Sequence, residues 1–189
     1  MKRNALLHQL VTHENTFDFI VIGGGATGLG IALDAITRGA SVALFEQDDF
    51  TKGTSSRSTK LVHGGVRYLA QGDVSLVLEA LRERGLLRKN ASHLVKNQSF
   101  LIPCYRWWEG AFYTIGLILY DLMAANLGFG RSFCIGPKRA VKTIPMLRKK
   151  GMKAGVIYHD GQFDDSRLAI NIAQTAVDAG ACVLNYMKV

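Results

Sequence analysis

The chain has 189 residues, 48% of them hydrophobic, which is enough for a packed core in one domain or in one and a part. Its 23 Lys and Arg against 15 Asp and Glu give a formal net charge of +8, which favours an anionic partner: a phosphorylated substrate, a dinucleotide, an acidic lipid surface or nucleic acid. The three cysteines are widely spaced and form no C-x-x-C pair, so neither a disulfide framework nor a metal site is expected.

Residues 1–16 form a polar leader, and we expect one incomplete domain over residues 17–189. The leader carries Lys2 and Arg3 but lacks the continuous apolar core and cleavage site of a secretory signal, which indicates a cytoplasmic protein. The longest apolar stretch, residues 111–120, is too short to cross a bilayer as a helix, which takes roughly 20 apolar residues. We therefore expect no membrane-spanning segment.

A βαβ unit is predicted at the start of the domain. Residues 17–22 (FDFIVI) are a continuous β-branched and aromatic run, as in a strand buried on both faces. Residues 26–38 place Leu29, Leu33 and Ile36 on one side of a helix. Residues 41–46 (SVALFE) form a second apolar strand, which gives the unit its usual length of about 30 residues.

The later elements are less regular. Residues 51–68 have the composition of an irregular loop, and loops of that length are usually functional. An exposed amphipathic helix is predicted at 74–89, and a helix plus a loop between 100 and 136. A strand at 155–159, a helix at 165–179 and a strand at 181–187 complete an α/β pattern. The sheet ends unfinished, which predicts a truncated domain.

The segment GGGATG (residues 23–28) satisfies G-x-G-x-x-G directly between a predicted strand and a predicted helix. Gly23 permits the tight turn, Gly25 lets the backbone approach a pyrophosphate, and Gly28 lets helix and strand pack closely. The helix N-terminus then offers free N–H groups to phosphates. Glu46 stands at the end of the second strand, where a carboxylate can accept both ribose hydroxyls. These features predict a bound dinucleotide, either NAD or FAD.

A second motif, TSSRSTKLVHGGVRYL (residues 54–69), carries hydroxyls, cations and paired glycines that suit a phosphate or a flavin edge, or simply a solvated basic loop. Together with IGGGATG, this run resembles the aerobic, respiratory FAD-dependent glycerol-3-phosphate dehydrogenases. The segments YHDGQFDDSRL (residues 158–168) and NYMKV (residues 185–189) look like the same family. The resemblance runs from about Phe17 to the last residue and matches the N-terminal portion of that family.

The resemblance implies a Rossmann-like FAD-binding domain of the glutathione-reductase type. It also implies oxidation of glycerol 3-phosphate to dihydroxyacetone phosphate, with hydride passing from C2 to flavin N5 and electrons leaving to a quinone. Arg67 and Tyr68 become substrate contacts, where a structural arginine and a packed aromatic are the alternatives. The implied FAD contacts are Gly23, Gly25, Ala26, Thr27, Gly28, Glu46, Gln47, Thr54, Ser55, Ser58, Lys60, Leu61, His63 and Val189.

Several alternatives stay open at this point. A glycerol-3-phosphate oxidase would use oxygen, and a non-catalytic flavin-binding fragment would hold FAD without turnover. His63 fits a hydrogen-bonding role better than proton transfer. The aromatic stretch at 107–119, with the basic residues around it, suits either an anionic surface on the inner face of the cell membrane or an ordinary core helix. Nucleic acid is not an expected partner, because the sequence has no recognisable reading helix or stacking platform.

Overall fold

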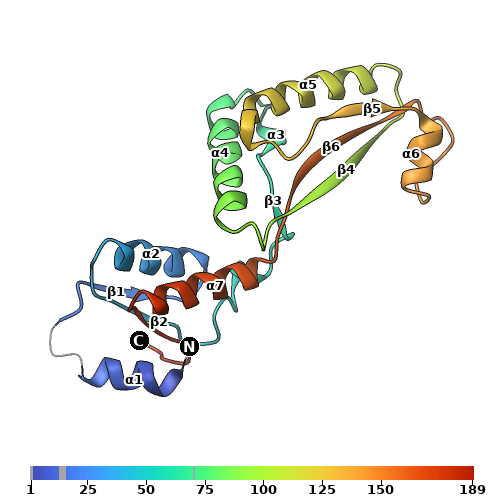
Figure 1. Ribbon diagram of the computed structural model, residues 1–189. Coiled ribbons are helices and arrows are strands. Elements are labelled where there is room, and N and C mark those ends of the chain that lie inside the picture. Colours follow the sequence, from blue (N-terminus) through green and yellow to red (C-terminus); the bar gives the residue numbers. More distant parts are fainter. Residues whose placement is uncertain (1, 13–15, 70) are drawn as a thin grey trace. The chain divides into compact units, whose positions relative to one another are not determined.

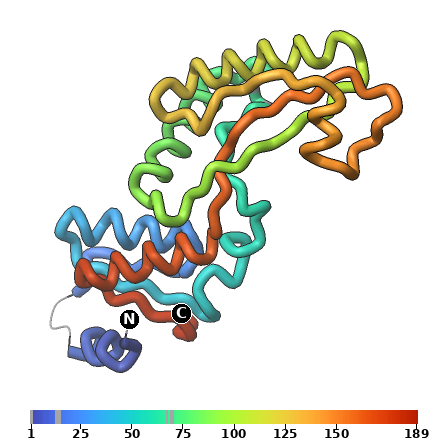
Figure 2. The backbone as a smooth tube through the Cα atoms, turned by 45° about the vertical axis from the view of Figure 1, so that its right-hand side comes forward, coloured from blue at the N-terminus to red at the C-terminus, as the bar shows by residue number. Residues whose placement is uncertain are grey.

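The computed structural model describes residues 2–12, 16–69 and 71–189, except for the side chains of Arg67 and Leu69. The described chain forms two compact units, whose course Figures 1 and 2 show. Unit 1 consists of Met1–Lys60 and Asp164–Val189, and unit 2 is the continuous segment Leu61–Phe163. Unit 2 is therefore an insertion in the chain of unit 1.

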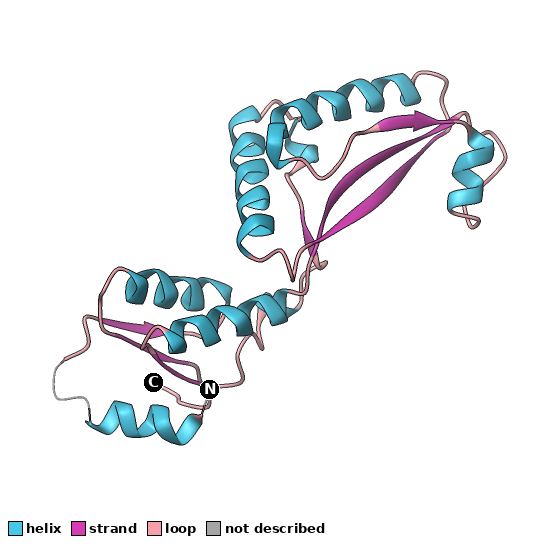
Figure 3. Cartoon of the chain, in the orientation of Figure 1, coloured by secondary structure: helices cyan, strands magenta, loops and turns pink. Residues whose placement is uncertain are grey.

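Unit 1 contains a parallel sheet with the strand order β1-β2-β7 (Figure 3). Its described elements are α1 (Arg3–Thr12), β1 (Phe19–Ile22), α2 (Ala26–Thr37), β2 (Val42–Phe45), the 3-10 helix η1 (Thr54–Ser56), α7 (Asp165–Asp178) and β7 (Cys182–Leu184). In the register, Phe19 lies opposite Val42 and Ala43 lies opposite Cys182. The predicted βαβ unit and the α/β fold class are confirmed.

Different helices cover the two faces of this sheet because side chains alternate along a strand. Val42 and Leu44 of β2 pack in one cluster with buried residues of α2 and α7, two helices that lie side by side in Figure 2. Ala43, between them, packs in a second cluster with Leu6 of α1. The sequence predicted only a polar leader over residues 1–16, whereas α1 within it closes one face of the sheet.

Strand β1 differs from its prediction as a strand buried on both faces. Val21 is buried, but Phe19, Ile20 and Ile22 are 51%, 63% and 70% exposed. In the described sheet β1 pairs with β2 alone, so it is an edge strand. A continuous apolar run therefore gave the strand correctly but not its position in the sheet.

Unit 2 is built on an antiparallel sheet in the order β3-β6-β4, with β5 also paired to β6. Its elements are β3 (Leu61–Val62), α3 (Val66–Leu69), α4 (Val74–Asn90), β4 (Lys96–Cys104), α5 (Glu109–Ala124), the 3-10 helix η2 (Ala125–Leu127), β5 (Phe133–Ile135), α6 (Pro137–Thr143) and β6 (Ala154–Gln162). Figure 1 shows α4 and α5 beside this sheet. One core cluster joins Val77 and Leu81 of α4 to Tyr120 and Ala124 of α5.

The sequence predicted a helix plus a loop over residues 100–136. The helix is confirmed as α5, but the prediction missed the strands β4 and β5. Strand β4 pairs with β6 from Lys96↔Gln162 to Cys104↔Ala154, a partner distant in sequence. Such a pairing leaves little local pattern, because β propensity reflects the packing of each strand against its neighbours. The helix predicted at 74–89 is confirmed as α4, although Val77, Leu81, Arg84 and Gly85 of this helix are buried.

Helix α5 is longer than the apolar stretch 111–120 considered in the sequence. Together with η2 it forms Glu109–Leu127, which by length and composition alone could cross a membrane, with 22% of its apolar window buried. Gly110, Leu117, Tyr120 and Ala124 are the buried residues of α5. One side of this helix is therefore part of the unit 2 core.

Candidate functional site

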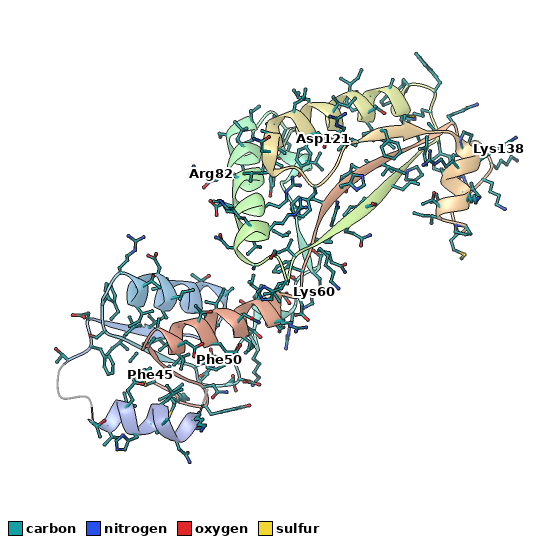
Figure 4. All side chains as sticks on the ribbon, in the orientation of Figure 1. Phe45, Phe50, Lys60, Arg82, Asp121 and Lys138 are labelled. Atoms are coloured by element: carbon teal, nitrogen blue, oxygen red, sulfur yellow. The ribbon has the colours of Figure 1, made fainter. Side chains whose placement is uncertain are left out.

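The turn between β1 and α2 has the geometry that the glycine motif predicted. Gly23 has a φ of +112°, which favours glycine, and its N–H donates to the Phe45 carbonyl at 2.8 Å. A Cβ on Gly28 would lie 2.0 Å from the Gly23 carbonyl oxygen, so helix and strand approach too closely for any side chain. The prediction missed Gly24, where a Cβ would lie 2.6 Å from the Phe50 ring, which Figure 4 labels in unit 1.

The N-terminus of α2 presents polar groups suited to a phosphate. Its N-cap residue, Gly25, provides no side-chain cap, and the next N–H, that of Ala26, donates to the Ser55 hydroxyl at 2.9 Å. A hydroxyl that accepts one hydrogen bond can still donate its own proton to an anion. The positive end of the helix dipole adds to this attraction. Ser55 on η1 is thus brought to the same turn as Gly25.

Glu46 ties the end of β2 to this turn. One carboxylate oxygen accepts the Gly24 N–H at 2.6 Å, and the other accepts the Asp48 N–H at 2.8 Å. Its main chain bonds to the segment around β7, with the Glu46 N–H donating to the Leu184 carbonyl at 2.9 Å and the Met187 N–H donating to the Glu46 carbonyl at 2.8 Å. Each carboxylate oxygen keeps a lone pair that a ribose hydroxyl can use.

A cleft of about 600 Å³ within unit 1 brings these groups together. Five of the predicted cofactor residues line it: Gly25, Glu46, Gln47, Thr54 and Ser55. Arg57 also lines it, a cation that the prediction missed although it stands in the quoted SSR run. Val189 lies outside this set of residues and is 74% exposed, two positions after Met187.

Lys60 is engaged inside unit 1. Its ammonium forms an ion pair with Asp165 and donates to the Ser56 carbonyl at 3.0 Å (Figure 4). The Ser58 N–H donates to the other Asp165 oxygen at 3.3 Å, and the Ser58 hydroxyl accepts the Lys60 N–H at 3.0 Å. The charge of Lys60 is therefore largely neutralised by Asp165, a residue that the prediction did not single out.

The pKa of the Asp165 carboxyl reflects two opposing effects. Burial raises it, but the hydrogen bonds from Lys60, Ser58 and Ser166 outweigh burial and lower the pKa to about 2. This carboxylate is therefore ionised at neutral pH, and it organises the segment that contains Ser58 and Lys60. The signal for it in the sequence was the acidic pair in the quoted DDSRL segment.

The other predicted contacts belong to unit 2. Leu61 lies in β3 opposite Gln162, and His63 is exposed just after that strand. The Gly65 N–H donates to His63 Nδ1 at 3.2 Å, which leaves the imidazole proton on Nε2. Tyr68 is 42% exposed on α3, and the side chain of Arg67 lies outside the described part of the chain. Unit 2 thus holds four predicted residues within one short segment.

Comparison with known proteins shows the family. Residues 18–189 match the sequence model of the FAD dependent oxidoreductases. The chain belongs to the FAD dependent oxidoreductase family. FAD is therefore the cofactor, which settles the choice that the glycine turn alone left between NAD and FAD. The open α2 N-terminus, the side-chain-free approach at Gly25 and Glu46 all fit this dinucleotide.

Two relatives and one solved structure are most informative. The mitochondrial glycerol-3-phosphate dehydrogenase of Homo sapiens is 47% identical over 96% of this chain and 26% of its own length. That of Saccharomyces cerevisiae is 46% identical over 100% of this chain and 30% of its own length. The structure of glycerol-3-phosphate dehydrogenase from Bacillus halodurans complexed with FAD is 36% identical, covers 100% of this chain and 29% of its own, and has a TM-score of 0.70. The chain spans less than a third of each.

Proposed function

We propose that this chain is the N-terminal portion of an FAD-dependent glycerol-3-phosphate dehydrogenase that oxidises glycerol 3-phosphate to dihydroxyacetone phosphate. The observation that carries the proposal is the 47% identity to a mitochondrial glycerol-3-phosphate dehydrogenase over 96% of the chain. The dinucleotide-binding geometry of unit 1 supports it independently. FAD bound in this chain would supply the hydride-acceptor chemistry for oxidation at C2 of the substrate.

In this proposal the residues of unit 1 bind the cofactor. The N–H groups at the start of α2, together with the Ser55 hydroxyl, receive the pyrophosphate, with Ala26 and Thr27 in the first turn of the helix. Glu46 accepts the ribose hydroxyls beside Gln47, and Arg57 balances the phosphate charge from the cleft wall. Asp165 holds Ser58 and Lys60 in place.

The segment of unit 2 that begins at Leu61 would serve the flavin ring and the substrate. Arg67 is proposed to bind the phosphate or the alcohol oxygen of glycerol 3-phosphate, because a guanidinium offers paired donors to such groups. Tyr68, on the same short helix, is proposed as its neighbour. His63, whose Nδ1 already accepts the Gly65 N–H, would donate from Nε2.

We also propose that the protein rests on an anionic membrane surface, at the inner face of the cell membrane, and passes its electrons to a quinone there. Apolar residues on the exposed side of α5 support this surface: Phe112, Ile115, Ile118, Leu119 and Leu122. Residues 122–159 contain eight Lys and Arg and no Asp or Glu, which equals the whole formal net charge of +8. An apolar face beside a cationic segment is typical of proteins that bind at a bilayer interface.

Cosedimentation with lipid vesicles tests this surface. We expect the protein to bind vesicles that contain phosphatidylglycerol more tightly than vesicles of phosphatidylcholine alone, and Ile115→Glu to weaken the binding. Leu78→Glu is the matched control, because Leu78 is a 47% exposed leucine on α4 of the same unit. Equal binding to both vesicle types, or equal loss in both variants, would contradict the surface assignment.

A visible spectrum tests the main proposal. The protein is mixed with FAD, desalted and then treated anaerobically with glycerol 3-phosphate, with glycerol as the control. We expect the flavin bands to be retained. Bleaching with the phosphorylated substrate only, followed by their return on adding a soluble quinone, would show that this portion is active without the rest of the enzyme. Return with oxygen but not with quinone would favour an oxidase, and bands that never bleach would favour a non-catalytic flavin-binding fragment. Failure to retain flavin would contradict the proposal.

A further inference from the structure

A buried charged network in unit 2 has no part in the proposed cofactor and substrate contacts. Arg84 of α4, Tyr120 of α5 and Asp160 of β6 are 2%, 1% and 3% exposed. Arg84 Nη1 donates to Asp160 Oδ1 at 2.5 Å and to the Tyr120 hydroxyl at 3.2 Å. Asp160 belongs to the YHDGQFDDSRL motif, in which Asp165 acts in unit 1. The network therefore joins three elements through side chains that water does not reach.

This arrangement gives little net stability compared with an apolar core, because both charges lose their hydration. Partial compensation comes from the Gly161 N–H, which donates to Asp160 Oδ1 at 3.1 Å, and from the Phe129 ring, 4.7 Å from the Arg84 guanidinium carbon. Arg84 Nε still lacks a hydrogen-bond partner among the described residues. In some proteins, buried polar groups of this kind favour one arrangement over its alternatives.

The Tyr120 hydroxyl connects the network to the turn that follows β3. Burial raises the pKa of Tyr120, and the Arg84 charge offsets this only in part, so the hydroxyl stays protonated. It has one proton to donate, toward Asp160 Oδ2 at 3.5 Å, and two lone pairs. Arg84 uses one lone pair, and the Gly64 backbone lies against the same hydroxyl oxygen. The network thus ends on the backbone of the turn that follows β3.

Packing fixes the same turn. A Cβ on Gly64 would lie 2.4 Å from the Tyr120 hydroxyl oxygen and 2.5 Å from a Leu81 methyl group, so this backbone sits directly on α4 and α5. Gly65 then takes a φ of +69°, and its N–H bonds to His63 as described above. The inner side of the turn is held by the network, and its outer side presents His63.

We propose that Tyr120, held by Arg84 and Asp160, is a positioning residue that fixes the turn at residues 63–65 and so sets the placement of His63 and of helix α3. This inference rests on the proposed function, in which that turn and that helix meet the flavin and the substrate. None of the three network residues is among the proposed cofactor and substrate contacts. Their effect on the cofactor is transmitted through the Gly64 backbone.

The decisive comparison is Tyr120→Phe against Tyr113→Phe. Both changes remove one phenol hydroxyl from α5, but Tyr113 packs elsewhere, with Cys104, Leu117 and Val156. Without FAD, we expect Tyr120→Phe to loosen the turn that packs on this hydroxyl. Hydrogen exchange of the Gly64 amide should then speed up about tenfold, roughly what one hydrogen bond lost from the network costs, whereas Tyr113→Phe should leave it unchanged. Unchanged exchange in Tyr120→Phe would overturn the proposal.

The second readout is the visible circular dichroism of bound FAD, which reports the surroundings of the flavin ring. We expect Tyr120→Phe to change this spectrum and Tyr113→Phe to preserve it. Gly64→Ala disturbs the same contact from the side of the turn, because its methyl group would collide with the Tyr120 hydroxyl, and it should reproduce the Tyr120→Phe spectrum. A faster Gly64 exchange with an unchanged flavin spectrum would reduce the network to a structural role and overturn the proposal. Failure of the unaltered protein to bind FAD would instead contradict the proposed function, while the exchange experiment still decides whether Tyr120 holds the turn.

Discussion

Two glycine turns that precede helices, residues 23–25 in unit 1 and residues 63–65 in unit 2, are held by different parts of the molecule. In unit 1, Gly23 and Gly28 fit against each other, and Glu46 accepts the Gly24 N–H from the next strand along the chain. In unit 2, Gly64 rests on Tyr120, which depends on Asp160 far along the sequence. The first turn is held by residues of the same βαβ unit, whereas the second is held by side chains that are distant in the sequence. Substitutions that disturb the two turns should therefore have different effects on stability and on FAD binding.

The largest expected effect comes from removing Asp160, the partner of Arg84 in the network of unit 2. Asp160→Ala leaves the Arg84 charge buried without its partner, and we expect it to lower the free energy of unfolding by about 3–5 kcal/mol. Urea unfolding followed by tryptophan fluorescence measures this, because both tryptophans, Trp107 and Trp108, belong to unit 2. Asp34→Ala is the control, since Asp34 and its partner Arg38 are 64% and 75% exposed. A loss no larger than that of the control would contradict the buried pair.

The next effect breaks the local support. Gly28→Ala places a methyl group 2.0 Å from the Gly23 carbonyl oxygen, so α2 must shift away from β1. We expect a destabilisation of about 1–3 kcal/mol and loss of FAD binding. Gly30→Ala is a matched control on the same helix, because its Cβ would meet open space and alanine favours helix by up to about 1 kcal/mol. Equal FAD affinity in the two variants would show that the close approach does not matter.

A third test uses acid, which acts on unit 1 through Asp165. Its pKa is about 2 in the folded protein against an ordinary value of 3.8, so the unfolded chain takes up a proton first as the pH falls. The stabilisation by Asp165 should be complete above pH 4 and lost progressively toward pH 2, by up to about 2 kcal/mol. Urea unfolding between pH 5 and pH 2 measures this loss. Asp165→Asn should flatten that part of the profile, and an unchanged profile would exclude the carboxylate as its source.

The smallest effect sharpens the account of the first turn. Glu46→Gln keeps the shape of the side chain but replaces one accepting oxygen with an amide nitrogen, which cannot accept an N–H. We expect the dissociation constant of FAD to rise about tenfold, measured by flavin fluorescence quenching. Asp34→Asn makes the same charge change away from the cleft and should leave the affinity unaltered. A smaller change in Glu46→Gln than in this control would argue against a ribose contact.

The sequence predicted unit 1 better than unit 2 for a physical reason. The βαβ elements follow one another directly, and each has its own apolar pattern, so their bounds were predicted to within about two residues. The partner residues of strand β4 lie 50 to 66 positions later in the chain, and the pattern QSFLIPC does not reveal them. The exposure of Phe19 and Ile20 could not be predicted either, because it depends on which strands flank β1 rather than on β1 itself.

The candidate site divides in the same way. Gly23, Gly28 and Glu46 followed from the motif, because strand, turn and helix fix their geometry. Lys60 stood in a quoted motif, but its pairing with Asp165 depends on a contact across more than one hundred residues. Asp160 also stood in a quoted motif, and only the fold shows that it pairs with Arg84 and meets the Tyr120 hydroxyl on which Gly64 packs.

Because unit 2 is inserted between Lys60 and Asp164, the order of synthesis separates the two halves of unit 1. The β1-α2-β2 segment leaves the ribosome first, yet α7, which covers the sheet, and β7, which pairs with β2, follow only after all of unit 2. Unit 2 is continuous and can fold while the first half still exposes its apolar side chains. During translation, we expect a chaperone to act on this first part of unit 1, Met1–Lys60.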